Sequence, residues 1–74
     1  MQIIVKLFAT YQVGRFKKEL MNYPACATVQ TVIEELELGE NRLGSVLING
    51  RVADLDQGLT DGDILALFPL VAGG

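Results

Sequence analysis

Residues 28–38, TVQTVIEELEL, carry the clearest periodic pattern of the chain and decide its fold class. Four apolar residues in this stretch follow the i, i+3, i+4, i+7 spacing of one helix face: Val29, Val32, Ile33 and Leu36. Thr28 is a favourable N-cap residue, and Gly39 suits the position just after a helix. The stretch predicts one amphipathic helix over 28–38 that must bury its apolar face against another layer.

Apolar segments on both sides of this helix predict that layer to be a β-sheet. Residues 2–9, QIIVKLFA, are rich in β-branched and aromatic residues, and Lys6 in their midst should face solvent. Alternation then turns Ile3, Val5 and Leu7 toward the core. Residues 16–23 predict a second strand, antiparallel to the first, that ends at Pro24.

The second half of the chain predicts a hairpin and a closing strand. Asn49 and Gly50 lie between two apolar runs within residues 45–54, and this pair favours a type I′ turn. Residues 55–62 predict a compact loop that Leu55 and Leu59 anchor in the core. Residues 64–68 predict the last strand, which Pro69 is expected to stop because proline donates no hydrogen bond.

Together these elements predict an α+β roll, with one main helix packed on one face of a mixed sheet. If the last strand lies beside the first, the helix crossover makes the two parallel. Residues 1–69 are expected to form one domain, and residues 70–74 a flexible C-terminal tail.

Composition excludes most classes of enzyme. The 74 residues contain no histidine and one cysteine, so His-based catalytic triads, His-based zinc sites and an internal disulfide are all excluded. No Walker loop or G-x-G-x-x-G motif occurs. A formal net charge of −3 argues against a nucleic-acid surface, and no segment is long and apolar enough to span a membrane. We expect a cytoplasmic protein that binds no metal and no cofactor and is not itself an enzyme.

The last residues are the best candidates for chemistry. Gly73 and Gly74 follow an apolar lead-in of Leu70, Val71 and Ala72. Paired glycines have no side chains, so they can thread a narrow channel and approach a nucleotide closely. The reactive group would be the α-carboxylate of Gly74, which becomes an acyl donor only after adenylation.

An exposed apolar patch is expected next to this tail. Alternation from Lys6 turns Phe8 outward, and the same reasoning places Leu47 and Phe68 on that face. Such patches mark interaction sites, and aromatic residues are frequent hot spots. The alternative is that one or two of these residues belong to the core. Cys26 is interpreted as a small buried residue rather than a reactive thiol, and the helix glutamates as a solvated face: Glu34, Glu35 and Glu37.

Residues 61–74, DGDILALFPLVAGG, resemble the C-terminal end of the MoaD/ThiS family of sulfur-carrier proteins. In that family a DGD turn, a strand, a Phe-Pro and a terminal Gly-Gly recur together. Three further segments match in the same order: VKLFA at 5–9, ATV at 27–29 and VLING at 46–50. The resemblance implies a β-grasp, ubiquitin-like fold.

The resemblance also implies a function and partners. An E1-like adenylyltransferase would adenylate Gly74 with ATP and magnesium, and the adenylate would become a thiocarboxylate. Phe68 and Pro69 resemble the Phe-Pro-Pro of MoaD proteins, which favours sulfur donation to a pterin with the large subunit of molybdopterin synthase. The tail and patch residues would contact the partners: Phe8, Leu47, Phe68, Pro69, Leu70, Val71 and Ala72.

Three alternatives remain open on the sequence. The same chemistry could serve thiazole synthase in thiamine formation, as in ThiS proteins. A ubiquitin-like modifier would instead attach Gly74 to lysines. A plain β-grasp binding module would not use the tail at all.

Overall fold

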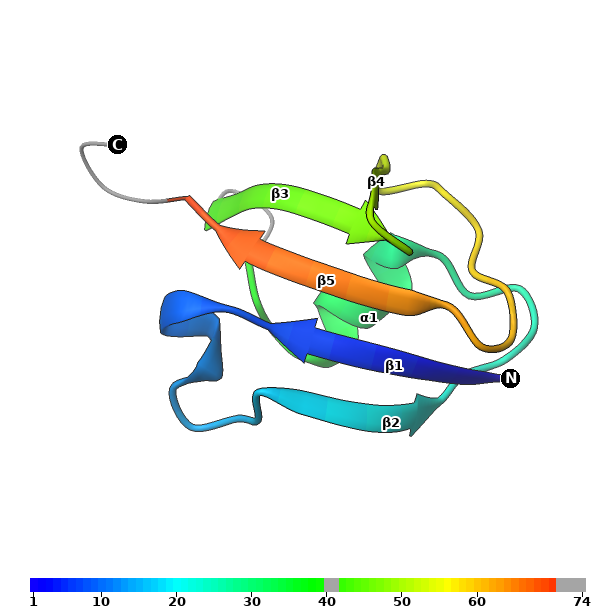
Figure 1. The fold of residues 1–74 in the computed structure, drawn as a ribbon, viewed down its shortest axis with the longest axis horizontal. Helices are drawn as coiled ribbons and strands as arrows, with labels where there is room; N and C mark the ends of the chain where they lie inside the picture. The colour runs from blue at the N-terminus through cyan, green and yellow to red at the C-terminus, as the bar shows by residue number, and fades with distance from the viewer. Residues whose placement is uncertain (40–41, 71–74) are drawn as a thin grey trace.

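The computed structural model describes residues 1–39 and 42–70 (Figure 1). The elements along the chain are β1 (Gln2–Leu7), the 3-10 helix η1 (Ala9–Gln12), β2 (Lys18–Asn22), α1 (Val29–Glu35), β3 (Leu43–Ile48), β4 (Arg51–Val52) and β5 (Ile64–Pro69). The strands form one sheet in the order β2-β1-β5-β3-β4. β1 and β5 are parallel, and the other neighbours are antiparallel. The predicted mixed sheet with a parallel central pair is confirmed.

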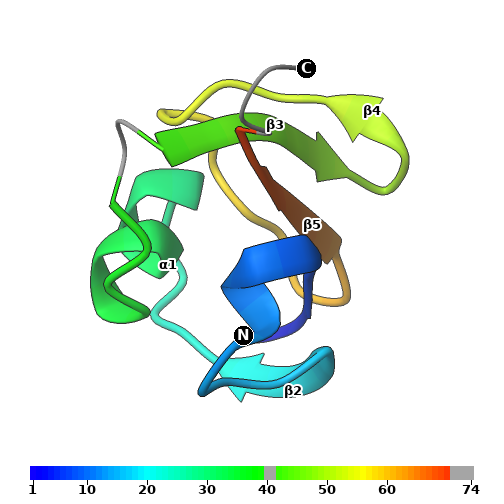
Figure 2. The same ribbon diagram turned by 90° about the vertical axis from the view of Figure 1, so that its left-hand side faces the viewer.

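Helix α1 packs on one face of this sheet (Figure 2). The strands bury alternate residues toward it, which confirms the core face predicted from Lys6. The fully buried side chains come from β1, β5 and α1: Ile3, Val5, Leu7, Leu65, Leu67, Val29, Val32 and Ile33. The opposite face, called here the outer sheet face, carries no helix in the described part of the chain.

The C-terminus of α1 differs from the prediction. The helix ends at Glu35 rather than at residue 38, so the C′ position falls on Glu37, which has a φ of 55°. Gly39, predicted at C′, lies two residues further along and also has a positive φ, 78°. The Glu37 N–H donates to the Glu34 carbonyl, and the Leu38 N–H donates to the Ile33 carbonyl, which together form a Schellman motif. The buried Leu38 side chain favours this early ending, since it anchors the chain in the core.

Replacing Glu37 with glycine is expected to stabilise the protein by about 1 kcal/mol, because glycine adopts a positive φ without a Cβ clash. Chemical denaturation measures the change. Glu34→Gly is the matched control: Glu34 is an exposed residue of α1, where glycine costs about 1 kcal/mol. Equal destabilisation by both variants would contradict the assignment of the cap.

Strand ends also depart from the sequence patterns. β1 ends at Leu7 because Ala9 adopts a φ of 52° and begins η1. β2 covers 18–22 rather than 16–23. Pro69 does not stop β5: it pairs with Leu43, and the Leu70 N–H donates to the Arg42 carbonyl at 2.7 Å. The nitrogen of Pro69 faces the β1 side, where β1 has already ended, so its missing N–H breaks no bond to β3.

The hairpin is confirmed, and one prediction about burial is wrong. Asn49 and Gly50 have φ values of 52° and 83°, as a type I′ turn requires. Leu59 is buried and Leu55 packs against the core, as predicted for the loop that follows. Cys26, expected to be buried, is exposed because it lies in the turn between Pro24 and Ala27 that precedes α1.

Candidate functional site

The start of the C-terminal tail is held against β3. Leu43 pairs with Pro69 and Ser45 with Phe68, so Gly44 is the extra residue of a β-bulge. A Cβ on Gly44 would lie 2.7 Å from the Pro69 carbonyl oxygen, so only glycine permits this approach. With the hydrogen bond from the Leu70 N–H to the Arg42 carbonyl, this contact holds the chain against β3 as far as Leu70.

Four of the residues predicted to act in the tail lie outside the described residues: Val71, Ala72, Gly73 and Gly74. Leu70, the last described residue, is 63% exposed. Pro69 lies on the buried face of β5. Of the predicted contact residues, the structure therefore offers Phe8, Leu47, Phe68 and Leu70 to a partner.

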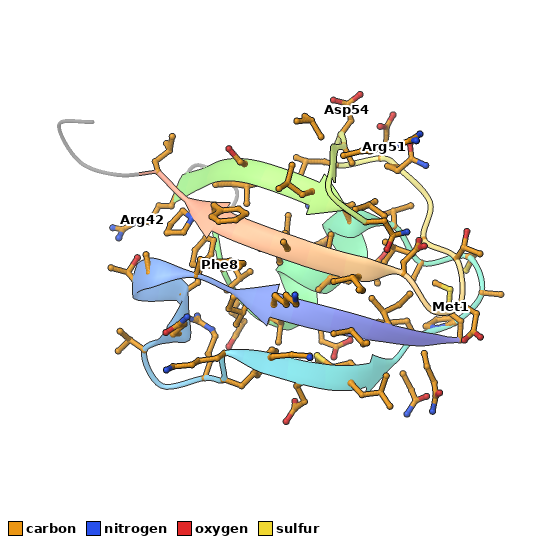
Figure 3. All side chains as sticks on the ribbon, in the orientation of Figure 1. Met1, Phe8, Arg42, Arg51 and Asp54 are labelled. Carbon is orange, nitrogen blue, oxygen red and sulfur yellow. The ribbon has the colours of Figure 1, made fainter. Side chains whose placement is uncertain are left out.

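Two phenylalanines stack beside the base of the tail. The rings of Phe8 and Phe68 lie 4.1 Å apart between centroids, with 12° between their planes. Both side chains are half-buried on the outer sheet face, as alternation predicts. Leu47 lies two positions along β3 from Ser45, the partner of Phe68, which makes Leu47 a diagonal neighbour of the stack. We call Phe8, Leu47 and Phe68 the aromatic patch (Figure 3 labels Phe8).

The apolar surface is wider than the sequence indicated. The register places Ile4 between Leu20 of β2 and Ile64 of β5 on the outer sheet face. Leu20 is 55% exposed and Ile64 is 37% exposed. Alternation from Lys6 had already predicted Ile4 on this face, which the register confirms. Leu20 was not predicted there, because Lys17, Lys18 and Glu19 interrupt the alternation of β2. Leu20, which lies opposite Ile4, was the apolar residue next to that charged stretch that could have indicated the wider surface.

The described residues contain little that could perform catalysis. No group of three or more metal-ligating side chains occurs among them. Burial raises the pKa of the Tyr11 phenol, and nearby Arg15 and Arg42 only partly offset this, so the hydroxyl remains protonated at neutral pH. Tyr11 is therefore unsuited to act as a general base.

A partly open depression of about 560 Å³ lies between the β3–β4 hairpin and the loop before β5. Several of its polar groups bond to one another. Asp63 accepts hydrogen bonds from the Asn49 side chain and the Thr60 N–H, at 2.9 and 2.8 Å. Arg51, which lines it, lies at the opposite end of the sheet from Phe8 (Figure 3). This depression is remote from the tail and forms a structural network.

Comparison with known proteins identifies the family of this chain. The model of the ThiS family matches residues 5–74, which include both terminal glycines. The chain belongs to the ThiS family. SAMP1 from Haloferax volcanii is similar at 30% identity and a TM-score of 0.77, with 100% of both chains covered. No curated protein sequence matches.

The descriptions of two further similar structures name a molybdopterin converting factor. One is described as molybdopterin converting factor subunit 1 from Pyrococcus furiosus: 29% identity, TM-score 0.77, 96% of this chain and 99% of that chain covered. The other is the complex of subunits 1 and 2 of that factor from Helicobacter pylori 26695: 22% identity, TM-score 0.68, full coverage of both chains. This ThiS family member thus has the expected β-grasp, ubiquitin-like fold.

As a ThiS family member with these neighbours, the chain is a ThiS/MoaD-like sulfur carrier or a ubiquitin-like modifier. It is thus a small carrier or modifier protein. None of the helices in the described ranges has the length and apolarity to cross a membrane.

The stack of Phe8 on Phe68 is expected to contribute to stability as well as to binding in this ThiS family protein. A double-mutant cycle with Phe8→Ala and Phe68→Ala should give a coupling energy of about 0.5–1.5 kcal/mol. Denaturation of the wild type, both single variants and the double variant measures it. Additive single effects would contradict a direct contact between the rings.

Proposed function

We propose that this protein is a cytoplasmic sulfur carrier whose working group is the Gly74 carboxylate. That carboxylate attacks the α-phosphorus of ATP and releases pyrophosphate, which forms an acyl-adenylate. Hydrosulfide, released by a sulfur donor, then attacks the acyl carbon and displaces AMP, and loss of its proton leaves a thiocarboxylate on Gly74. The main support is that the chain is held at Leu70, at the end of β5 and beside the aromatic patch. The family model also matches the chain through Gly73 and Gly74.

Partner enzymes perform this chemistry, and the chain itself is not an enzyme and binds no cofactor. An E1-like adenylyltransferase supplies the site for ATP and magnesium. An extended chain of four residues reaches at most about 14 Å, so the nucleotide must lie within that distance of Leu70. The Gly73 backbone, which lacks a side chain, lets the carboxylate enter the narrow site.

We assign the sulfur to molybdopterin or tungstopterin cofactor synthesis, in complex with the large subunit of molybdopterin synthase. The likeness to the Pyrococcus furiosus converting factor subunit 1 supports this branch. The Helicobacter pylori complex of subunits 1 and 2 illustrates the pairing we propose. The ThiS family model supports the alternative acceptor, thiazole synthase.

A second candidate is a ubiquitin-like modifier that forms isopeptide bonds with lysines. The 30% identity with SAMP1, a small archaeal modifier protein, favours it. The adenylate would be the same, and a lysine amine would replace the sulfur nucleophile. The two candidates therefore differ in the product and not in the activation step.

Intact-mass analysis tests the proposal. The protein is produced together with the E1-like enzyme of its own organism and a sulfur donor. We expect a species in which one oxygen is exchanged for sulfur. Unmodified protein alone would refute the carrier function, and high-mass conjugates on a denaturing gel would indicate the modifier. Incubation of the sulfurated protein with each acceptor enzyme then separates the pterin branch from the thiazole branch.

A further inference from the structure

Two lysines face each other on the outer sheet face. Lys6 of β1 is the register partner of Lys18 of β2. The next pair along the two strands is Leu7 and Lys17, and it is hydrogen-bonded: the Leu7 N–H donates to the Lys17 carbonyl at 2.9 Å. Hydrogen-bonded and non-hydrogen-bonded pairs alternate along antiparallel strands, so Lys6 and Lys18 form a non-hydrogen-bonded pair. Such pairs bring their side chains closest. Like charges directly opposite each other destabilise a sheet, so this placement costs the free protein stability.

Among residues 1–39 and 42–70, no acidic side chain of the outer sheet face offsets these two charges. The only acidic residue of the five strands is Glu19, which pairs with Val5, a core residue, and so lies on the other face. Within the described ranges, neither lysine has a carboxylate partner. The other neighbours of Lys6 on this face are apolar: Ile4 of β1, Phe8 just beyond the end of β1, and Ala66 of β5. A chain of net charge −3 thus has a locally cationic docking face.

We propose that Lys6 and Lys18 together receive a carboxylate of the protein partner that docks on the outer sheet face. This rests on the proposed function, since the partner is the E1-like enzyme that adenylates Gly74. A carboxylate between the two ammonium groups removes their repulsion and gains two charge-assisted hydrogen bonds. The apolar surface around the pair suits an apolar contact on the same partner.

The surface fits a protein better than a nucleic acid. Nucleic-acid affinity is built from many phosphate contacts on a basic face. Here two cations lie within an apolar surface that includes Ile4, Leu20 and the aromatic patch. An apolar contact with a few matched charges is the usual composition of a protein interface.

Charge reversal at the two lysines tests the proposal. The measurement is ATP–pyrophosphate exchange catalysed by the organism's own E1-like adenylyltransferase, as a function of carrier concentration. Lys6→Glu and Lys18→Glu are each expected to raise KM about tenfold or more, equivalent to about 1.4 kcal/mol, with kcat unchanged. Arg51→Glu is the matched control, because it makes the same charge change at the opposite end of the sheet. Its KM is expected to equal that of the wild type.

Lys18→Met supplies a second readout, because it removes the charge and keeps an apolar stem. Its thermal unfolding midpoint should equal or exceed that of the wild type, while its KM rises. Lysine variants that behave like Arg51→Glu would overturn the proposal and leave the carrier function intact. Absence of exchange with the wild type would overturn both. Lysine-dependent binding of a fluorescent single-stranded oligonucleotide, with no KM effect, would assign the pair to nucleic acid instead.

Discussion

Removal of Gly74 is expected to abolish thiocarboxylate formation and to leave the unfolding transition unchanged. The shortened chain still ends in a glycine carboxylate, but the group lies one residue closer to the sheet. Because β5 holds the chain as far as Leu70 by its bond to Arg42, the missing length cannot be recovered without breaking that contact. Intact-mass analysis after co-production with the activating enzyme measures the loss.

Gly74→Ala, measured in the same assay, separates the effect of tail length from the effect of a side chain beside the reacting carboxylate. This variant keeps the carboxylate at its position and adds one methyl group beside the reacting carbon, so we expect slow but measurable sulfur incorporation. If the chain without Gly74 acquired sulfur at the wild-type rate, the Gly74 carboxylate would not be the functional group. If the wild type formed conjugates with lysines and no thiocarboxylate, and removal of Gly74 abolished these conjugates, the protein would be a modifier.

Gly44→Ala is expected to destabilise the protein by about 1–3 kcal/mol, as other overpacked sites do. The added Cβ would lie 2.7 Å from the oxygen and 2.9 Å from the carbon of the Pro69 carbonyl. These are backbone atoms and cannot rotate away, so either β3 or the base of the tail must move. Chemical denaturation measures the cost.

The local effect of this change is read at Leu70. Loss of its hydrogen bond to Arg42 should accelerate hydrogen exchange of the Leu70 amide. Gly58→Ala is the matched control, because a Cβ there meets nothing within 4 Å. We expect Gly58→Ala to be neutral or slightly stabilising. Unchanged Leu70 exchange in Gly44→Ala would show that the bulge does not direct the tail.

Most of the fold could be predicted because the signals were local. The spacing of Val29, Val32 and Ile33 predicted α1, and the Asn49-Gly50 pair predicted the hairpin turn. The ends of the elements were less accurate, since they depend on distant partners. The burial of Leu38 ended α1 early, at Glu35 rather than at residue 38, and the Arg15 guanidinium donates to the Leu36 and Glu37 carbonyls just beyond it.

The candidate site also contains some features that local sequence patterns predict and others that depend on the pairing of strands. Alternation about Lys6 was enough to place Phe8 and Phe68 outward, because one marker residue determines the face of a whole strand. The opposition of Lys6 and Lys18 could not be predicted, because no local pattern determines how two strands are aligned along each other. The role of Gly44 likewise could not be predicted, because it depends on the pairing of β3 with β5.

The sequence by itself therefore determined the class of the protein. Periodicity, turn chemistry, the absence of histidine and the ordered motifs that end in Gly73 and Gly74 were sufficient. Only the tertiary structure decided how the chain is held as far as Leu70 and which charges lie on the outer sheet face. Pro69 does not interrupt β5 because its nitrogen faces the side on which β1 has ended. That fact depends on the lengths and register of three strands, and such long-range pairing is not encoded in any single stretch of the chain.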